Sequence, residues 1–138
     1  MRAEENASPA RRPLTIDDLS RLNHTLRSAA DRTLIFPAVE ALAREVIGHR
    51  MFTIMRFDAE RIEVERLYSS YPDAYPVGGR KKKARTLWAD HVLHGMRVHY
   101  ANTPDAVRAA FDDHDTIFGL GIGAILNIPL VFSGRCIG

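Results

Sequence analysis

The chain has 138 residues, of which 46% are hydrophobic and 26% charged, and its formal net charge is +2. This composition is typical of a globular domain with an ordinary core, and so small a net charge argues against a nucleic-acid partner. One cysteine excludes an internal disulfide framework and a multi-cysteine zinc site, and it fits a reducing cytoplasm. No apolar run approaches the roughly 20 residues that span a membrane, so no membrane contact is expected.

The first residues carry charges of both signs and prolines without an apolar segment, so we expect a disordered arm over residues 1–14. Residues 15–138 are expected to form a single domain. Thr15 is placed as the N-cap of a helix. Along that helix runs a narrow apolar stripe: Leu19, Leu22, Leu26 and Ala29. The stripe either packs on the domain or pairs with a second helix, and it is our reason to expect a homodimer.

Pro37 is expected at the first position of a second helix, whose wide apolar face ends at Gly48. Residues 51–57 are apolar on both faces, and residues 62–70 alternate as in a strand with one wet face. These two segments therefore predict an antiparallel hairpin. Residues 71–85 contain two prolines, two glycines and a basic run, which predicts a long loop.

Thr86 is expected to cap a helix that ends at Gly95, followed by a strand over residues 98–101 and a helix over residues 103–114. Residues 124–132 predict one long, mostly buried strand. Ser133-Gly134 then predicts a two-residue turn into a return strand. Because a return strand normally runs five or six residues, we expect a domain that is incomplete at its C-terminus.

The strands thus come in hairpins that flank inserted helices, rather than in repeated strand–helix–strand units. This order predicts an α+β fold with a mainly antiparallel sheet, helices on its faces and an N-terminal helix.

The hairpin over residues 52–70 and the run over residues 124–138, with Pro129 inside an apolar strand and Gly138 after an apolar return strand, resemble GAF domains. The resemblance covers residues 37–138 and implies a GAF/PAS-like antiparallel sheet. It also implies that the return strand continues beyond Gly138 and lies in the sheet beside the first strand.

Members of this family mostly bind small molecules or dimerise, so the resemblance implies a non-catalytic regulatory domain with an unknown small-molecule effector. The Asn-Lys-x-Phe-Asp-Glu pattern of cyclic-nucleotide members is absent, and so are the cysteine and Asp-Ile-Pro motif of bilin-binding members. Cys136 alone does not reproduce the several cysteines of free-methionine-sulfoxide reductases. The ligand and any cofactor therefore stay open.

Histidines and carboxylates gather in the second half of the chain: His91, His94, His99, Asp112, Asp113, His114 and Asp115. His91 and His94 lie three residues apart, which suits metal ligation. Such pairs also arise by chance, and no His-Glu-x-x-His frame is present. We therefore favour surface or pocket histidines over a metal site.

Two further features have a structural and a functional interpretation. The basic run at residues 80–85 either contacts phosphate or an acidic partner or is a solvated loop, and the loop is favoured because no aromatic residue interleaves. Cys136 lies in a strand and is expected to be a small buried side chain rather than a reactive thiol.

Three polar or aromatic side chains have two candidate roles each. Trp88 is expected to pack against the sheet, with ligand stacking as the alternative. Arg56 either anchors a ligand carboxylate or phosphate or pairs with Glu63 or Glu65 across the hairpin. Asn127 either orients a ligand or satisfies a strand-edge bulge.

These considerations predict a cytoplasmic sensor whose effector fills a cavity between the sheet and residues 86–95 and 103–120. By analogy with the family fold, the expected pocket residues are Arg56, Tyr68, Trp88, His91, Phe111, His114, Phe118 and Asn127. The alternatives are a dimerisation or scaffold module without a ligand, and an enzyme with redox chemistry at Cys136 or metal chemistry at the histidines.

Overall fold

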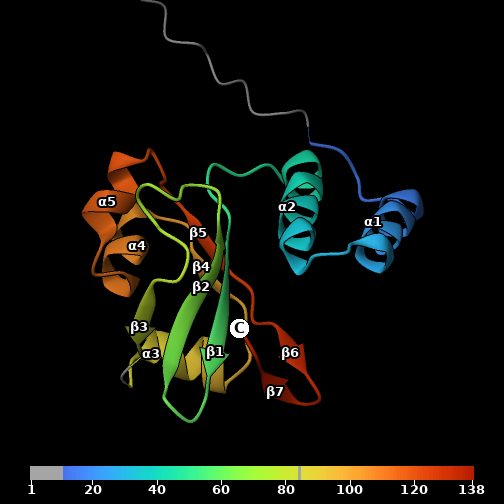
Figure 1. Cartoon of the computed structure of the whole chain (residues 1–138). Coiled ribbons are helices and arrows are strands. Elements are labelled where there is room, and N and C mark those ends of the chain that lie inside the picture. The colour runs from blue at the N-terminus through green and yellow to red at the C-terminus, as the bar shows by residue number, and fades with distance from the viewer. Residues whose placement is uncertain (1–10, 84) are drawn as a thin grey trace, which may run out of the picture. The chain divides into compact units, whose positions relative to one another are not determined.

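The computed structural model describes residues 11–83 and 85–138, which form helices and antiparallel strands (Figure 1). Contacts within the chain divide it into two compact units, with the boundary between Arg50 and Met51. The mixed α+β class is confirmed, whereas a single domain over residues 15–138 stays a prediction. Residues 1–10 of the predicted arm lie outside the described residues. Within the described ranges, no helix combines the length and the apolar character that crossing a bilayer requires.

The described residues of the first unit, 11–50, contain α1 (Ile16–Ser28), the 3-10 turn η1 (Arg32–Leu34) and α2 (Ile35–Val46). Thr15 caps α1 as predicted, since its hydroxyl accepts a hydrogen bond from the N–H of Asp18 and the Asp18 carboxylate accepts one from the N–H of Thr15. The buried Asp18 carboxylate also pairs with Arg12 at 2.7 Å and with Arg21. Hydrogen bonds from Arg12, and then from Thr15, hold the pKa of Asp18 well below its usual range.

α2 begins at Ile35, two residues before the predicted start at Pro37. Pro37 therefore occupies the third helical position, where its missing N–H still removes no intrahelical hydrogen bond. α2 ends at Val46 with Ile47 as its C-cap, so the predicted stop signal Gly48 directly follows the cap. The N–H of Gly48 donates to the carbonyl oxygen of Ala43 at 3.2 Å, and its positive φ, 74°, turns the following chain away from the helix.

The second unit begins with a sheet of three antiparallel strands in the order β1-β2-β3: β1 (Thr53–Asp58), β2 (Glu63–Ser69) and β3 (Arg80–Lys82). The predicted hairpin of β1 and β2 is confirmed. β3 corrects the prediction of an unbroken loop over residues 71–85, since Arg80 lies opposite Glu65 and Lys82 opposite Glu63. Opposite charges across a ladder stabilise it, so the basic run forms a strand where the facing strand is acidic.

Five elements follow along the chain: α3 (Leu87–Ala89), the π-helical turn η2 (Asp90–His94), β4 (His99–Ala101), α4 (Pro104–Ala110) and α5 (His114–Gly119). The helix that Thr86 caps and Gly95 ends is confirmed, and its last turn is π-helical because the N–H of Gly95 bonds five residues back at 2.7 Å. The single helix predicted over residues 103–114 is wrong. It ends at Ala110, because Phe111 is extended, and α5 is a separate helix.

The last elements are β5 (Ile125–Asn127), β6 (Val131–Phe132) and β7 (Arg135–Cys136). The long buried strand predicted over residues 124–132 is wrong, since β5 pairs with β4 and β6 pairs with β7. Pro129 lies in the break, and proline has no N–H to donate to a ladder. Several apolar side chains of this segment are exposed, Phe132 to 70%. The turn at Ser133-Gly134 is confirmed, with the positive φ at both residues that a type I′ turn needs.

Among the described residues the strands form three short antiparallel sheets, β1-β2-β3, β4-β5 and β6-β7. Antiparallel pairing is therefore confirmed, whereas a single GAF/PAS-like sheet stays a prediction. The N–H of Phe57 in β1 donates to the carbonyl oxygen of Ile137 at 2.9 Å. Ile137, which follows β7, thus lies beside β1.

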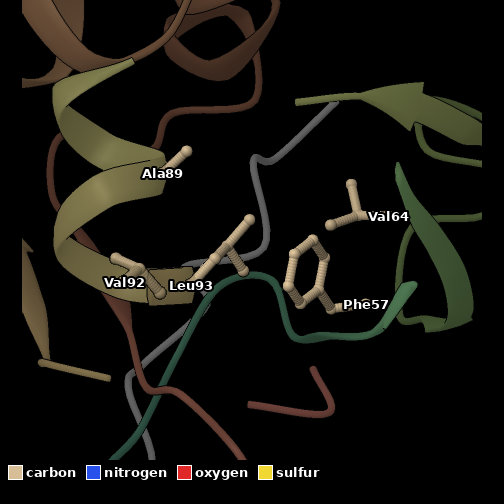
Figure 2. Packing of buried hydrophobic residues seen from close by; sticks show 5 residues of the cluster. All are labelled: Phe57, Val64, Ala89, Val92 and Leu93. Carbon is tan, nitrogen blue, oxygen red and sulfur yellow. The ribbon is translucent and has the colours of Figure 1, made fainter. Parts of the chain in front are cut away.

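Two small hydrophobic cores hold the second unit together. The first joins β1 and β2 to the helical segment at residues 87–94: Phe57, Val64, Ala89, Val92 and Leu93. Figure 2 shows Leu93 directed from that segment toward the strand residues. The second core joins β4, α4 and α5: Ala101, Val107 and Ile117. Trp88 packs against the first core and Phe111 against the second, so the segments between the cores position the candidate site.

Candidate functional site

Trp88 and Asn127 are 39 residues apart in the sequence and meet in the structure. The indole Nε1–H of Trp88 donates a hydrogen bond to Oδ1 of Asn127 at 3.0 Å. Trp88 is held in place by the first core and by the N-cap of α3, where the hydroxyl of Thr86 accepts a hydrogen bond from the N–H of Ala89. Asn127 is the last residue of β5. The hydrogen bond therefore ties α3 to β5 and brings two predicted pocket residues together.

His99 extends this contact toward the second core. The β4–β5 register sets His99 directly opposite Asn127, so the two side chains share a face. The His99 ring lies edge to face with His91, at 6.2 Å between centroids, and with Phe111 at 6.3 Å. The Nε2–H of His91 donates to the carbonyl oxygen of Val98 at 3.0 Å, which fixes that ring. We call this set the Trp88–Phe111 cluster: Trp88, Asn127, His99, His91 and Phe111.

His99 is the member of the cluster that the predicted pocket omits. Its Nδ1 is buried and, among the described residues, has no hydrogen-bond partner. A buried polar atom without a partner costs about 1–3 kcal/mol, so a bound molecule that supplies a hydrogen bond there is stabilised. In the sequence His99 is one of several histidines. What distinguishes it is its register opposite Asn127, which depends on pairing between distant segments.

Two cations of the second unit lie over aromatic rings, and one of these rings belongs to the cluster. The ammonium group of Lys83 lies 4.5 Å from the centre of the Trp88 ring, and burial lowers the pKa of Lys83. The guanidinium of Arg66 lies 5.0 Å from the centre of the Tyr75 ring. The Tyr75 hydroxyl donates to a carboxylate oxygen of Asp113 at 2.7 Å, and burial, together with this hydrogen bond, raises the pKa of Tyr75. Neither Arg66 nor Lys83 belongs to the predicted pocket.

His114 and Phe118 form a second group on α5, with 6.1 Å between their ring centroids. The guanidinium of Arg108 lies 5.0 Å from the centre of the Phe118 ring, and Nδ1 of His114 lies 3.1 Å from a carboxylate oxygen of Asp115. Phe118 packs against the second core, as Phe111 does. These two predicted pocket residues are therefore connected to the Trp88–Phe111 cluster through that core.

Arg56 lies on the other face of its sheet. Phe57 and its partner Val64 face the first core, so Arg56, the preceding residue of β1, points the opposite way. There it pairs with Glu65 at 2.5 Å. This is the ion pair across the hairpin that the sequence allowed as the alternative to ligand binding, and the structure does not bring Arg56 into the cluster.

Tyr68 is also directed away from the cluster. Ile54 lies opposite Tyr68 whereas Met55 lies opposite Arg66, so Leu67 is the extra residue of a β-bulge. Because Met55 packs against the first core, Arg66 shares the inner face and Tyr68 the outer one. Strict alternation along β2 would have placed Tyr68 inward, and a bulge of this kind leaves no clear sign in the sequence.

Other candidate residues have packing contacts. The His94 ring lies edge to face with Phe57 at 6.1 Å between centroids. Cys136 packs against the first core, and its thiol donates to the carbonyl oxygen of Gly138 at 3.3 Å. Within the part of the chain that the structure describes, no three His, Cys, Asp or Glu side chains gather as metal ligands would.

No model of a known protein family matches the chain, and no curated protein matches its sequence. Of the eight predicted pocket residues, the structure brings Trp88, His91, Phe111 and Asn127 into one cluster. His99 completes that cluster.

Proposed function

We propose that this chain is a cytoplasmic regulatory module of GAF type that binds a small-molecule effector at the Trp88–Phe111 cluster and has no catalytic activity of its own. The observation that supports binding most directly is the buried Nδ1 of His99, unpaired among the described residues, in the middle of predicted pocket side chains. The GAF type is supported by the sequence resemblance and by antiparallel strands that alternate with helices. The cytoplasm is supported by the presence of one cysteine.

The cluster offers mixed chemistry to a small molecule. Its aromatic rings provide apolar faces, while the His99 imidazole accepts a hydrogen bond when it is neutral and donates one when it is protonated. The indole N–H of Trp88 fixes the orientation of the Asn127 amide on the same face as His99. Small-molecule sites typically combine mostly apolar walls with a few polar groups of fixed direction.

Effector binding at this place acts by population shift. The cluster draws its residues from α3, η2, β4, β5 and the end of α4, so a bound molecule favours states in which these short elements are ordered around it. A π-helical turn, here η2 with His91, is a frequent feature of functional sites. The ordered state then changes how the module pairs with a partner.

The test is to purify the protein, denature it and identify the released small molecules by mass spectrometry against a buffer blank. We expect a stoichiometric metabolite, and its addition to emptied protein should raise the melting temperature by the linkage between binding and folding. The proposal is rejected if no molecule is released and a broad metabolite library produces no thermal shift.

Variants at His99 locate the site. His99→Phe keeps the ring contacts to His91 and Phe111 but removes the nitrogen, so it should lose the effector while staying folded. His24→Phe, on the exposed surface of α1, is the matched control and should retain it. Equal binding by both variants would remove His99 from the site.

A second candidate function, self-association through α1, is supported by the exposure of its apolar stripe. Leu19 is 50% and Leu26 40% exposed. If this stripe pairs with a second copy, Leu22→Lys with Leu26→Lys should reduce the mass in solution to that of a monomer, whereas Ser20→Lys should not. An unchanged mass of the double variant would refute the role of the stripe.

A further inference from the structure

Arg66 and Lys83 both lie on the inner side of the second unit. Arg66 lies opposite Met55 across the β1–β2 ladder, and Met55 packs against the first core. Lys83 follows β3, where its N–H donates to the carbonyl oxygen of Ile62 at 2.8 Å, and its side chain reaches the Trp88 ring. Both side chains are half-buried, so neither charge is freely solvated.

Arg66 is held in place, but among the described residues no carboxylate pairs with it. Its guanidinium lies over Tyr75 at 5.0 Å, and its Nη1–H donates to the carbonyl oxygen of Pro76 at 3.2 Å. Its Nε–H is buried and has no acceptor among the described residues. A buried charged donor without an acceptor is costly, and the planar guanidinium is suited to a carboxylate or a phosphate oxygen.

In the part of the chain that the structure describes, Lys83 has no carboxylate partner either. Within the described residues no carboxylate oxygen lies at ion-pair distance from Arg66 or Lys83, whereas Arg12 and Arg80 have one at 2.7 and 3.2 Å. Burial lowers the pKa of Lys83 most strongly. The charge of Lys81 also lowers that pKa, the charges of Asp113 and Asp112 raise it, and the charge of Arg66 lowers it further.

We propose that Arg66 and Lys83 bind the anionic group, a carboxylate or a phosphate, of a small molecule whose remaining atoms lie against the Trp88–Phe111 cluster. This inference rests on the proposed function, since Lys83 and Asn127 contact the same indole, that of Trp88. The anion supplies the acceptor that the Arg66 Nε–H lacks, and its negative charge attracts both half-buried cations. The inference therefore assigns the effector to the class of small organic acids or phosphate esters.

Trp88 is the one tryptophan of the chain, so its fluorescence reports on the site without a label. We would titrate inorganic phosphate and malonate in separate experiments at constant ionic strength with chloride as the balancing anion. A saturable change in emission with either probe is expected, and the probe that binds more tightly distinguishes a phosphate from a carboxylate effector. A response that follows ionic strength alone, or no response to either probe, overturns the inference.

Variants separate this site from general charge effects. Lys83→Met and Arg66→Met should each raise the dissociation constant about 10- to 100-fold, as expected for the loss of a hydrogen bond to a charged group. Lys82→Met is the matched control, because Lys82 is exposed and lies opposite Glu63 on the other face of the strand, and it should bind as the parent does. Equal weakening by Lys82→Met would overturn the inference.

The variant at Lys83 is expected to fold, because burial already disfavours its charge and methionine keeps most of the apolar stem. If Arg66→Met does not fold, Arg66→Lys, which keeps the charge but loses the fork, replaces it and should also weaken binding. If a metabolite is released from the protein and binds the Lys83→Met variant with unchanged affinity, the inference is overturned while the proposed function stands. If the protein binds no metabolite but binds phosphate or malonate, and Lys83→Met abolishes that binding, the anion site is upheld and the proposed function is rejected.

Discussion

The hydrogen bond between Trp88 and Asn127 gives the sharpest test of how the candidate site is built. In the parent protein the indole nitrogen of Trp88 lies 3.0 Å from the amide oxygen of Asn127. Asn127→Leu removes that oxygen and leaves the half-buried indole N–H without this acceptor. Leaving such a donor unpaired costs about 1–3 kcal/mol, so the free energy of unfolding should fall by about 2 kcal/mol. With a urea m-value of about 2 kcal/mol/M, the midpoint of unfolding moves by roughly 1 M.

A double-mutant cycle isolates the bond from other effects of each substitution. Trp88→Phe removes the donor and keeps an aromatic ring against the first core, and the double variant removes both partners. We expect the double variant to be about 1 kcal/mol less destabilised than the sum of the single variants. Urea unfolding followed by far-UV circular dichroism measures all four proteins. A coupling energy below about 0.3 kcal/mol would show that the bond does not tie α3 to β5 in solution.

Four further outcomes are expected. Val107→Ala, at a fully buried position, should cost roughly 2 kcal/mol in urea unfolding, and a cost near zero would contradict the second core. Gly95→Ala should also destabilise, because an added Cβ would lie 2.7 and 2.9 Å from carbonyl oxygens of the preceding turn, whereas Gly119→Ala, with open space around it, should not. Hydrogen bonds from an arginine and from the N-cap depress the pKa of Asp18. The carboxylate therefore stabilises α1 fully above the ordinary carboxyl pKa of about 4, and this stabilisation is lost as the pH falls below that value. Helicity lost between pH 7 and pH 5, or an equal loss of helicity in acid for Asp18→Asn, would contradict this. Arg56→Ala should bind the effector as the parent does, because its side chain lies on the outer face of the sheet, and weaker binding in a ligand titration would contradict that placement.

Local signals in the sequence predicted the elements that short-range chemistry controls. Thr15 and Thr86 cap helices because their hydroxyls accept hydrogen bonds from N–H groups three residues ahead, and the sequence alone shows that spacing. At Gly134 in the turn and at Gly48 after α2 the chain has positive φ angles, which glycine adopts at no steric cost. The β1–β2 hairpin follows from two neighbouring apolar patterns separated by a short turn.

Two errors about strands arose where pairing between distant segments decided the outcome. The basic run became β3 because acidic residues of β2 face it, and the apolar run at residues 124–132 was divided between two different partner strands. In the candidate site, too, local patterns pointed to individual residues but not to the contacts between them. The sequence identified Trp88 and Asn127 as residues of interest, but it contained no signal for their contact.

By itself, then, the sequence determined the α+β class, the positions of the helix caps and turns, and a set of polar and aromatic residues in the second half of the chain. Only the tertiary structure decided which of them meet. The bulge at Leu67 turned Tyr68 outward and Arg66 inward, and the β4–β5 register set His99 opposite Asn127. The physical reason is that a strand has a side-chain period of two, so one residue of register, fixed by a partner far away in the sequence, decides which face every side chain occupies.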